Sequence, residues 1–163
     1  MIIHYMQDRD RALPLSPIPT EKLGRIDAYP VNEIAEYVQD VSQGDIDVLV
    51  EEYYNKYDMI LDGHDPEEFK KHVAVQAGIE IGFERFLEEK NYQAIVTHFG
   101  DLGSLKQLPG LAIQRLMEKG YGFGGEGDWK TAAMGIEAVY IDGDTTIRNL
   151  QNELRWNSMY FSK

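Results

Sequence analysis

The sequence predicts an α/β domain built on an incomplete, Rossmann-like parallel sheet with flanking helices. Three observations lead to this class. The segment Gln93–Phe99 is rich in β-branched residues and is followed by glycine, which is typical of a buried strand. Apolar residues recur at helical spacing over residues 111–117, and Tyr121–Phe123 then forms a second short strand. Strand, helix and strand at this spacing predict a βαβ unit, whose two strands run parallel with a right-handed crossover.

Three amphipathic helices are predicted upstream of this unit. The first follows Asn32, which we expect to cap it, and the second follows the break at Ser42–Asp45. The third starts at Asp65, with a proline in its first turn and carboxylates at the positive end of the helix dipole. Gly78 and Gly82 lie inside this helix at a cost of about 1 kcal/mol each relative to alanine. We therefore expect them to allow close packing against another backbone.

The two ends of the chain show weaker patterns. Met1–Glu21 contains three prolines between residues 14 and 19, which exclude a ladder strand and a helix interior there, so an extended leader or linker is predicted. Ile26–Val31 indicates a short strand that a proline interrupts. Near the other end, Ala138–Ile141 predicts a strand and Thr145–Tyr160 a terminal helix.

Composition limits the classes of function. The chain has 163 residues, of which 43% are hydrophobic and 27% charged, as expected for one globular domain. It contains no cysteine, which excludes disulfides and thiolate metal sites and favours the reducing cytoplasm. A net charge of −12 repels nucleic acid and anionic membranes, so neither is expected as a partner. No apolar run approaches the length of a membrane span or a secretory signal.

Two loops are expected to follow the carboxyl ends of the predicted strands, where parallel sheets bind ligands. They are residues 99–104 and residues 123–128. In the second loop, Glu126 lies among three glycines, so its carboxylate projects into open space and can bind a hard cation or move a proton. The alternative is a flexible turn whose acid caps a helix starting at Asp128. The residues alone leave both interpretations open.

A dinucleotide site is a further alternative. Gly122–Gly127 matches the pattern G-x-G-x-x-G, and Asp142 lies where a ribose-binding acid would be expected. Against this hypothesis, Glu126 would face the pyrophosphate and the preceding strand is very short. The following helix is also too short for a crossover of about ten residues or more. The pattern therefore does not favour dinucleotide binding.

The four histidines do not show the spacing of a metal site. His4 falls in the predicted leader, His64 in a turn and His72 on a helix face. His98 alternates with an aromatic residue at a strand end, which favours a hydrogen-bonded structural role.

A long run of residues resembles the signature of the L-arabinose isomerases. It comprises Leu105–Met117, continued by Gly120–Ala133. Ile26–Ile34 is similar to the start of that family's central domain, and Glu137–Asp142 and Asn152–Asn157 are similar to its extreme C-terminus. The resemblance implies three parts, which are a leader over residues 1–21, a fucose/arabinose isomerase-like central α/β domain over 22–134, and a strand–helix tail over 135–163.

The resemblance also implies an activity. The family interconverts L-arabinose and L-ribulose in arabinose catabolism, often also D-galactose and D-tagatose, as a cytoplasmic, Mn²⁺-dependent homo-oligomer. A divalent cation polarises the sugar oxygens while a carboxylate moves the proton through an enediol. By motif, Glu126 matches the first metal-binding, catalytic glutamate of the family. Phe99 matches an aromatic residue that lines the sugar pocket.

The chain departs from the family pattern in several places. Between Met134 and Gly135 the family has a long segment that holds a second glutamate and two histidines of the metal site, and here the chain joins directly across it. We also expect the chain to lack the family's N-terminal domain, and Gly100 and Arg25 stand where the resemblance leads us to expect glutamate and tryptophan. With three of four metal ligands missing, we expect an enzyme by descent that is catalytically incomplete. The alternative is a noncatalytic remnant or a module that docks on full-length subunits.

Overall fold

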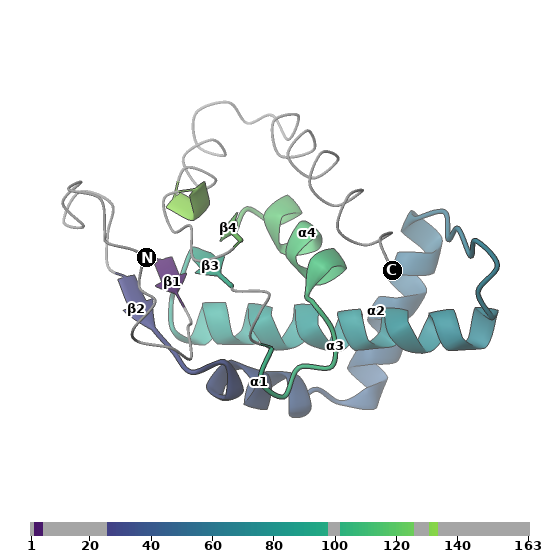
Figure 1. Ribbon diagram of the computed structural model, residues 1–163, viewed down its shortest axis with the longest axis horizontal. Coiled ribbons are helices and arrows are strands. Elements are labelled where there is room, and N and C mark those ends of the chain that lie inside the picture. The colour runs from purple at the N-terminus through teal and green to yellow at the C-terminus, as the bar shows by residue number, and fades with distance from the viewer. Residues whose placement is uncertain (1, 5–25, 98–101, 126–130, 134–163) are drawn as a thin grey trace.

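The computed structural model describes residues 2–4, 26–97, 102–125 and 131–133 (Figure 1). The elements in chain order are β1 (Ile2–His4), β2 (Ile26–Ala28), α1 (Val31–Gln39), α2 (Gln43–Lys56), α3 (Pro66–Glu89), β3 (Ala94–Val96), α4 (Gly110–Glu118) and β4 (Gly122–Gly124). Residues 131–133 are also helical. The predicted strand Ala138–Ile141 and the terminal helix Thr145–Tyr160 lie outside the described residues.

The strands form one parallel sheet in the order β2-β1-β3-β4. This confirms an α/β class with a parallel sheet. It also confirms the predicted pairing of β3, an interior strand, with β4. Two hydrogen bonds extend this ladder beyond the strand ends, from Gly122 N–H to the Gln93 carbonyl at 2.9 Å and from Thr97 N–H to the Gly124 carbonyl at 3.2 Å. The strand, helix and strand over residues 94–124 therefore form the unit that the apolar pattern predicts.

Strand β1 was not predicted. Its three residues pair with β2 on one side and β3 on the other, although they fall within the segment expected to be a leader. The prolines that suggested a leader lie at residues 14–19 and do not restrict residues 2–4. A three-residue strand is too short for a period to be recognised in sequence. Its place in the sheet depends on neighbours that come more than 20 residues later.

The two faces of the sheet pack against different elements. Ile95 contributes to the main core, together with buried side chains of α1, α3 and α4. Ala94 and Val96 belong to a second, smaller cluster with Ala132 and Ala133. This alternation follows from the two-residue period of a strand. In Figure 1 the helical segment 131–133 lies on the opposite side of the sheet from α3.

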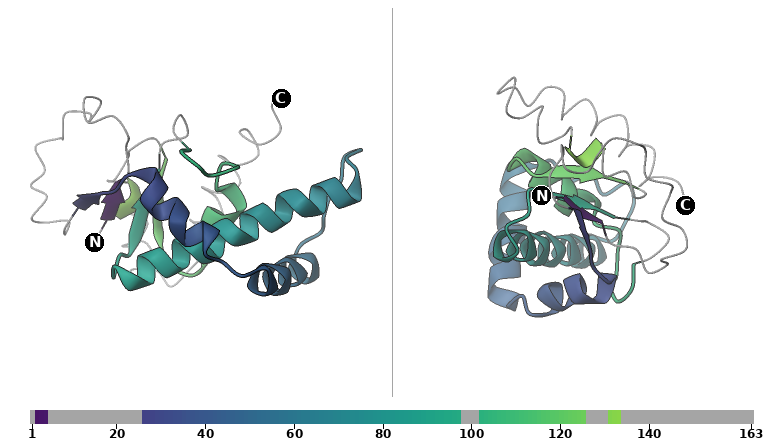
Figure 2. Two further views of the ribbon diagram at one scale, coloured as in Figure 1. Left: turned by 90° about the horizontal axis from the view of Figure 1, so that it is seen from below. Right: turned by 90° about the vertical axis from the view of Figure 1, so that its left-hand side faces the viewer.

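Helix α3 is the longest element and begins as predicted. The Asp65 carboxylate accepts the N–H groups of Glu67 and Glu68 at 3.0 Å each, and Pro66 occupies the first turn. Its 24 residues correspond to roughly 36 Å, so the helix extends well beyond the sheet, as Figure 2 shows. Asn91, with φ of 56°, ends it in the left-handed region. No helix in the described part of the chain combines the length and apolar character that crossing a membrane requires.

The prediction that Asn32 caps α1 is wrong. The helix begins at Val31 after Pro30, which makes no capping side-chain bond. The Asn32 side chain instead accepts the backbone N–H of Ser104 at 3.0 Å, so it connects α1 to a distant loop. Short polar side chains serve either role equally well, and only the tertiary structure selects one.

The two glycines of α3 behave differently. A Cβ at Gly82 would lie 2.6 Å from Cα and 2.7 Å from N of Val38, so the α1 backbone approaches α3 directly at this point. A Cβ at Gly78 would meet only the side chain of Ile46, at an ordinary 3.5 Å. Close backbone packing is therefore confirmed at Gly82 and not at Gly78.

A chain of hydroxyl groups connects the sheet to the aromatic part of the core. Tyr92 donates a hydrogen bond to the Asp27 carboxylate at 2.7 Å. Because that hydroxyl has used its hydrogen, Tyr29 must donate to Tyr92, also at 2.7 Å. Burial, followed by the hydrogen bonds with Tyr29 and Asp27, raises the pKa of Tyr92 above its usual range. The hydroxyl therefore stays protonated and keeps β2 attached to the segment before β3.

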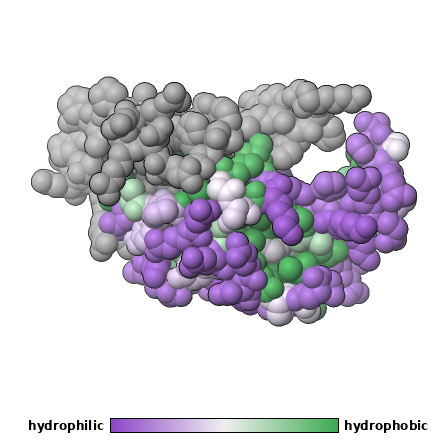
Figure 3. Space-filling view, turned by 60° about the horizontal axis from the view of Figure 1, so that its bottom comes forward, coloured by the Kyte–Doolittle hydropathy of each residue, from purple (hydrophilic) through white to green (hydrophobic). Residues whose placement is uncertain are grey.

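A shallow groove of about 390 Å³ lies between α1, the start of α2, α3 and residues 104–106. Its lining is mainly apolar and includes Val38, Ile46, Val75, Ile79 and Leu105. The face drawn in Figure 3 shows apolar surface bordered on its sides by hydrophilic side chains. Part of the apolar surface is thus left accessible among the described residues.

Candidate functional site

The predicted site residues Phe99 and Glu126 lie outside the described residues, so their placement stays a prediction. The structure does describe the strands that lead to them. Val96 at the end of β3 is paired with Gly124 at the end of β4, and the two strands run in the same direction. The loops that contain Phe99 and Glu126 therefore leave the same edge of the sheet. A Cβ at Gly125 would have no atom of the described residues within 4 Å.

The far end of the first loop is held against α1. Gly103 has φ of 51°, and a side chain there would overlap Val31 and Asn32, so the position requires glycine. The next residue, Ser104, donates its N–H to Asn32 and accepts a hydrogen bond from Gln39 Nε2 at 3.3 Å. Sequence reasoning missed this attachment because its partners are more than 60 residues apart. Residues 103–104 are therefore attached to α1.

A buried ionic cluster joins α2, α3 and α4. Glu80 on α3 is fully buried, and its Oε2 atom accepts hydrogen bonds from Tyr53 Oη at 2.5 Å and Arg115 Nε at 2.8 Å. Lys119 Nζ lies 2.9 Å from the other oxygen, Oε1, as an ion pair without hydrogen-bonding geometry. Arg115 also pairs with Glu52 at 2.5 Å. The buried carboxylate is thus surrounded by donors from two other helices.

The electrostatics of this cluster keep Arg115 charged and the Tyr53 hydroxyl protonated. Burial alone would lower the pKa of Arg115, but the hydrogen bond with Tyr57 and the charge of Glu80 outweigh it and raise the pKa above its usual range. Burial, and then the charge of Glu80, raises the pKa of Tyr53 as well. The guanidinium also lies 4.9 Å from the centre of the Tyr53 ring. Because its members are paired with one another, the cluster is suited to holding helices together rather than to catalysis.

In sequence, Glu80 and Arg115 look like ordinary helix charges, and they were not predicted as special. They lie 35 residues apart. The available signal was the apolar stripe of α4, in which Arg115 falls between Ile113 and Leu116, but a long charged residue in such a stripe is common because it can extend its head group to water. Here it does not, since Arg115 is only 5% exposed.

Among the described residues, no group of three or more histidine, aspartate or glutamate side chains could hold a metal ion. His64 and His72 line a common pocket, but His72 Nδ1 is engaged by an amide nitrogen, Gln107 Nε2, at 2.7 Å. The described part of the chain therefore does not supply a donor set that fits Mn²⁺. Glu126, the predicted ligand, lies outside it.

Comparison with known proteins identifies the family. Residues 21–142 match the sequence model of the L-arabinose isomerase central domain. The chain belongs to the L-arabinose isomerase family. The matched range includes both loops at the carboxyl edge of the sheet, and it confirms the resemblance carried by the signature after Leu105.

Relatives in this family are similar over most of the chain. The L-arabinose isomerase of Serratia proteamaculans is 48% identical over 119 residues, which are 72% of this chain and 24% of the relative. That of Geobacillus stearothermophilus is 43% identical over 122 residues, 74% of this chain and 25% of the relative. L-arabinose isomerase 1 of Clostridium acetobutylicum is 49% identical over 109 residues, 67% of this chain and 22% of the relative. The chain thus spans about a quarter of the length of the curated relatives it matches.

Proposed function

We propose that this chain carries the sugar-binding sheet edge of an L-arabinose isomerase. In this proposal Phe99 lines the sugar pocket and Glu126 is the carboxylate that acts on the substrate. The activity in question is the aldose–ketose isomerisation of L-arabinose to L-ribulose, in the cytoplasm. The observation that carries the proposal is the parallel pairing of β3 with β4 inside the family match, which directs both loops to one edge.

The strand order supports the same edge. In the order β2-β1-β3-β4, the direction of winding reverses between β1 and β3. In open parallel sheets, ligands bind beyond the carboxyl ends of the strands at such a reversal. Phe99 follows β3 by three residues, and Glu126 follows the adjacent β4 by two. This order is also the basis for proposing a Rossmann-like sheet.

The chemistry sets what the site needs. Isomerisation of the aldose moves the proton on C2 to C1. The O2 hydroxyl loses its proton as the C2 carbonyl forms, and O1 gains a proton as the C1 carbonyl becomes a hydroxyl. A positioned carboxylate can carry the carbon-bound proton, and such acid–base transfer contributes about 10²–10⁴-fold to the rate. The oxygen protons and the developing charge need further groups. Mn²⁺ is the group that the family implies for polarising these oxygens, but the described residues offer no donor set for it.

We therefore propose that the 163-residue polypeptide does not isomerise L-arabinose by itself, with or without added Mn²⁺. Glu126 is one proton-transfer group, and a metal held by one carboxylate would exchange with solvent. The test measures ketose formation from L-arabinose with Mn²⁺ added, for the wild type and for Glu126→Gln. Turnover in the wild type that disappears in Glu126→Gln would show that the missing ligands are present after all.

Sugar binding is tested separately from turnover. We expect L-arabinose to shift the backbone amide signals of Thr97 and Gly125 in NMR spectra, since these residues border the two loops. Phe99→Ala should remove the shifts, whereas the matched control Asp58→Asn, at an exposed position away from the sheet, should keep them. The absence of any shift in the wild type would contradict a sugar site at this edge.

A second candidate function is a noncatalytic module that docks on full-length subunits of the family. The apolar groove between α1 and α3 favours it, because exposed apolar surface of this kind often marks an interaction site. Mixing the polypeptide with the Geobacillus stearothermophilus relative and measuring co-migration in gel filtration separates the two candidates. Co-migration that Val75→Asp abolishes would support docking, and independent migration would refute it.

A further inference from the structure

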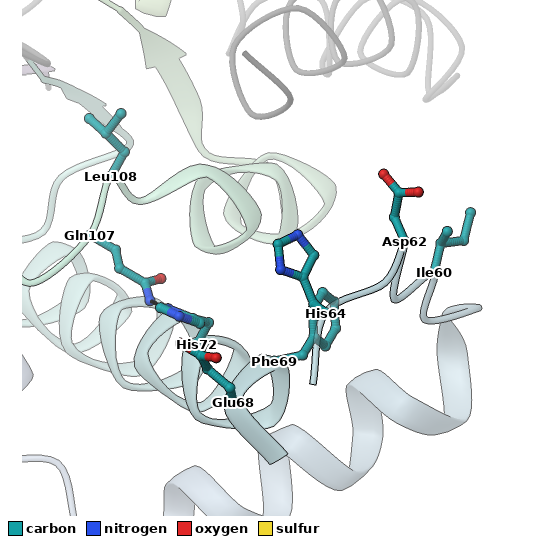
Figure 4. A pocket seen from close by; sticks show the side chains of 8 residues that line it. All are labelled: Ile60, Asp62, His64, Glu68, Phe69, His72, Gln107 and Leu108. Atoms are coloured by element: carbon teal, nitrogen blue, oxygen red, sulfur yellow. Dashed lines mark hydrogen bonds between the residues drawn. The ribbon is translucent and has the colours of Figure 1, made fainter. Parts of the chain in front are cut away.

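A pocket of about 640 Å³ lies beside the end of α3 that is farther from the sheet. It is formed by the connection between α2 and α3, the first turns of α3, and residues 107–108 (Figure 4). Its volume falls in the range of about 300–1,000 Å³ that is usual for small-molecule sites. It is separate from the carboxyl edge of the sheet, and it does not depend on the function proposed above.

A series of hydrogen bonds that starts at the backbone determines which ring nitrogen of His72 carries the proton. Gln76, which is 8% exposed, accepts the N–H of Ala112 with Oε1 at 3.3 Å. Its Nε2 donates to the carbonyl of Leu108 and to Oε1 of Gln107, both at 2.8 Å. A backbone N–H can only donate and a carbonyl can only accept, so neither amide can be turned over without placing two donors or two acceptors together.

This series of hydrogen bonds ends at His72. Gln107 Nε2 lies 2.7 Å from His72 Nδ1, and an amide nitrogen can only donate, so Nδ1 must carry the lone pair. The hydrogen of the neutral ring is therefore on Nε2. His72 therefore offers a ligand its Nε2–H as a donor. The backbone N–H of Ala112 in α4 sets the direction of every hydrogen bond in this series.

The other lining residues complete a pattern of donors, acceptors and apolar surface. Glu68 offers carboxylate oxygens that only accept hydrogen bonds, and the His64 ring can both donate and accept. Figure 4 shows both side chains in the pocket. Phe69 and Leu108 add apolar surface. The two carboxylates in the lining, Glu68 and Asp62, disfavour an anion, and the absence of a three-ligand group among the described residues disfavours a metal ion. A hydroxyl group suits the pattern because it both donates and accepts.

We propose that this pocket binds a neutral polyhydroxy compound, of which a monosaccharide is the simplest case. One hydroxyl oxygen accepts the His72 Nε2–H, a second hydroxyl donates to Glu68, and the C–H face of the ring packs on Phe69. No covalent step is involved. The pocket is open and would make only a few contacts with the sugar, so a Kd in the millimolar range is expected.

The first experiment tests the fixed donor. Long-range ¹H–¹⁵N spectra of the imidazole rings should show His72 with a protonated Nε2 and an unprotonated Nδ1. In Gln107→Glu, the carboxylate can only accept, so the proton should move to Nδ1. An unchanged His72 ring in Gln107→Glu would overturn the assignment of the donor.

The second experiment tests binding with D-glucose, a sugar outside the proposed isomerase reaction. D-glucose should shift the His64 and His72 ring signals in the full chain, and inorganic phosphate should not. His72→Leu should weaken D-glucose binding about fivefold, which corresponds to the ~1 kcal/mol of one neutral hydrogen bond. The matched control Lys70→Gln, on the same helix but outside the pocket lining, should bind as the wild type does.

Glu68→Gln provides a second variant, since its backbone bond to Asp65 does not involve the altered side chain. It should also weaken binding. The proposal is overturned if D-glucose leaves both ring signals unmoved, or if His72→Leu and Glu68→Gln both bind with wild-type affinity. Shifts that persist in Phe99→Ala but vanish in His72→Leu would separate this pocket from the site at the sheet edge.

Discussion

Replacing Gly82 by alanine should destabilise the protein, although alanine favours helices. The added methyl carbon would lie 2.6 Å from Cα, 2.7 Å from N and 2.7 Å from Cγ2 of Val38. Comfortable contact between carbon atoms begins at about 3.5 Å, so α1 would have to move away by about 1 Å. Two of the atoms in the way belong to the backbone and cannot rotate aside.

The magnitude follows from this movement. Ile34 and Ala35 of α1 are buried in the main core, and a gap of up to about 1 Å forfeits a quarter to a half of each contact they make. Overpacking of a core costs about 1–3 kcal/mol, and the upper end applies because the backbone must shift. Alanine returns about 1 kcal/mol of helix propensity. A net loss of about 2 kcal/mol is expected, which for a chain of this length lowers Tm by about 4–8 °C.

Gly78→Ala is the matched control in the same helix. Its methyl group would meet only the Ile46 side chain, at 3.5 Å, so the gain in helix propensity should remain and raise Tm by about 2–4 °C. Both variants are compared with the wild type by thermal and urea unfolding, followed by circular dichroism at 222 nm. Opposite signs for the two substitutions are the expected result.

A double variant, Gly82→Ala with Val38→Ala, separates backbone from side-chain obstruction. Val38→Ala removes Cγ2 but leaves Cα and N in place, so it should not restore stability. Gly82→Ala with wild-type stability would refute the close approach of α1 to α3. Full recovery in the double variant would show that only the Val38 side chain was in the way.

Two further predictions concern buried polar groups. Arg115→Met leaves the buried Glu80 carboxylate without its guanidinium partner and should lower the free energy of unfolding, measured in urea, by about 3–5 kcal/mol. The double variant Arg115→Met with Glu80→Leu should recover much of this loss. A double variant as unstable as the single one would contradict the prediction. Tyr92→Phe removes both hydrogen bonds of the Tyr29–Tyr92–Asp27 series and should lower the free energy of unfolding by about 2 kcal/mol. Tyr29→Phe removes one of them and should lower it by about 1 kcal/mol. Equal losses would mean that Tyr92 is not the central hydroxyl.

Local features of this chain were readable from its sequence because their physics is local. The Asp65 cap acts on N–H groups two and three residues away, and the left-handed Gly120, with φ of 106°, ends α4 where the apolar stripe stops. The parallel pairing of β3 with β4 followed from a strand–helix–strand pattern of ordinary spacing. The run after Leu105 was long enough to identify the family, which the match over residues 21–142 confirms. The roles of Phe99 and Glu126 were predicted in the same way and stay predictions.

Only the tertiary structure decided which distant groups meet. β1 becomes an interior strand because β2 and β3 pair on either side of it, and three residues carry no period that would announce this. Glu80 looks like a surface carboxylate until α4 brings Arg115 to it, and Asn32 looks like a helix cap until Ser104 occupies its side chain. Hydrogen bonds and ion pairs depend on distances of a few ångströms between residues far apart in the chain. A linear pattern lists the groups that can form them, and packing chooses among the partners.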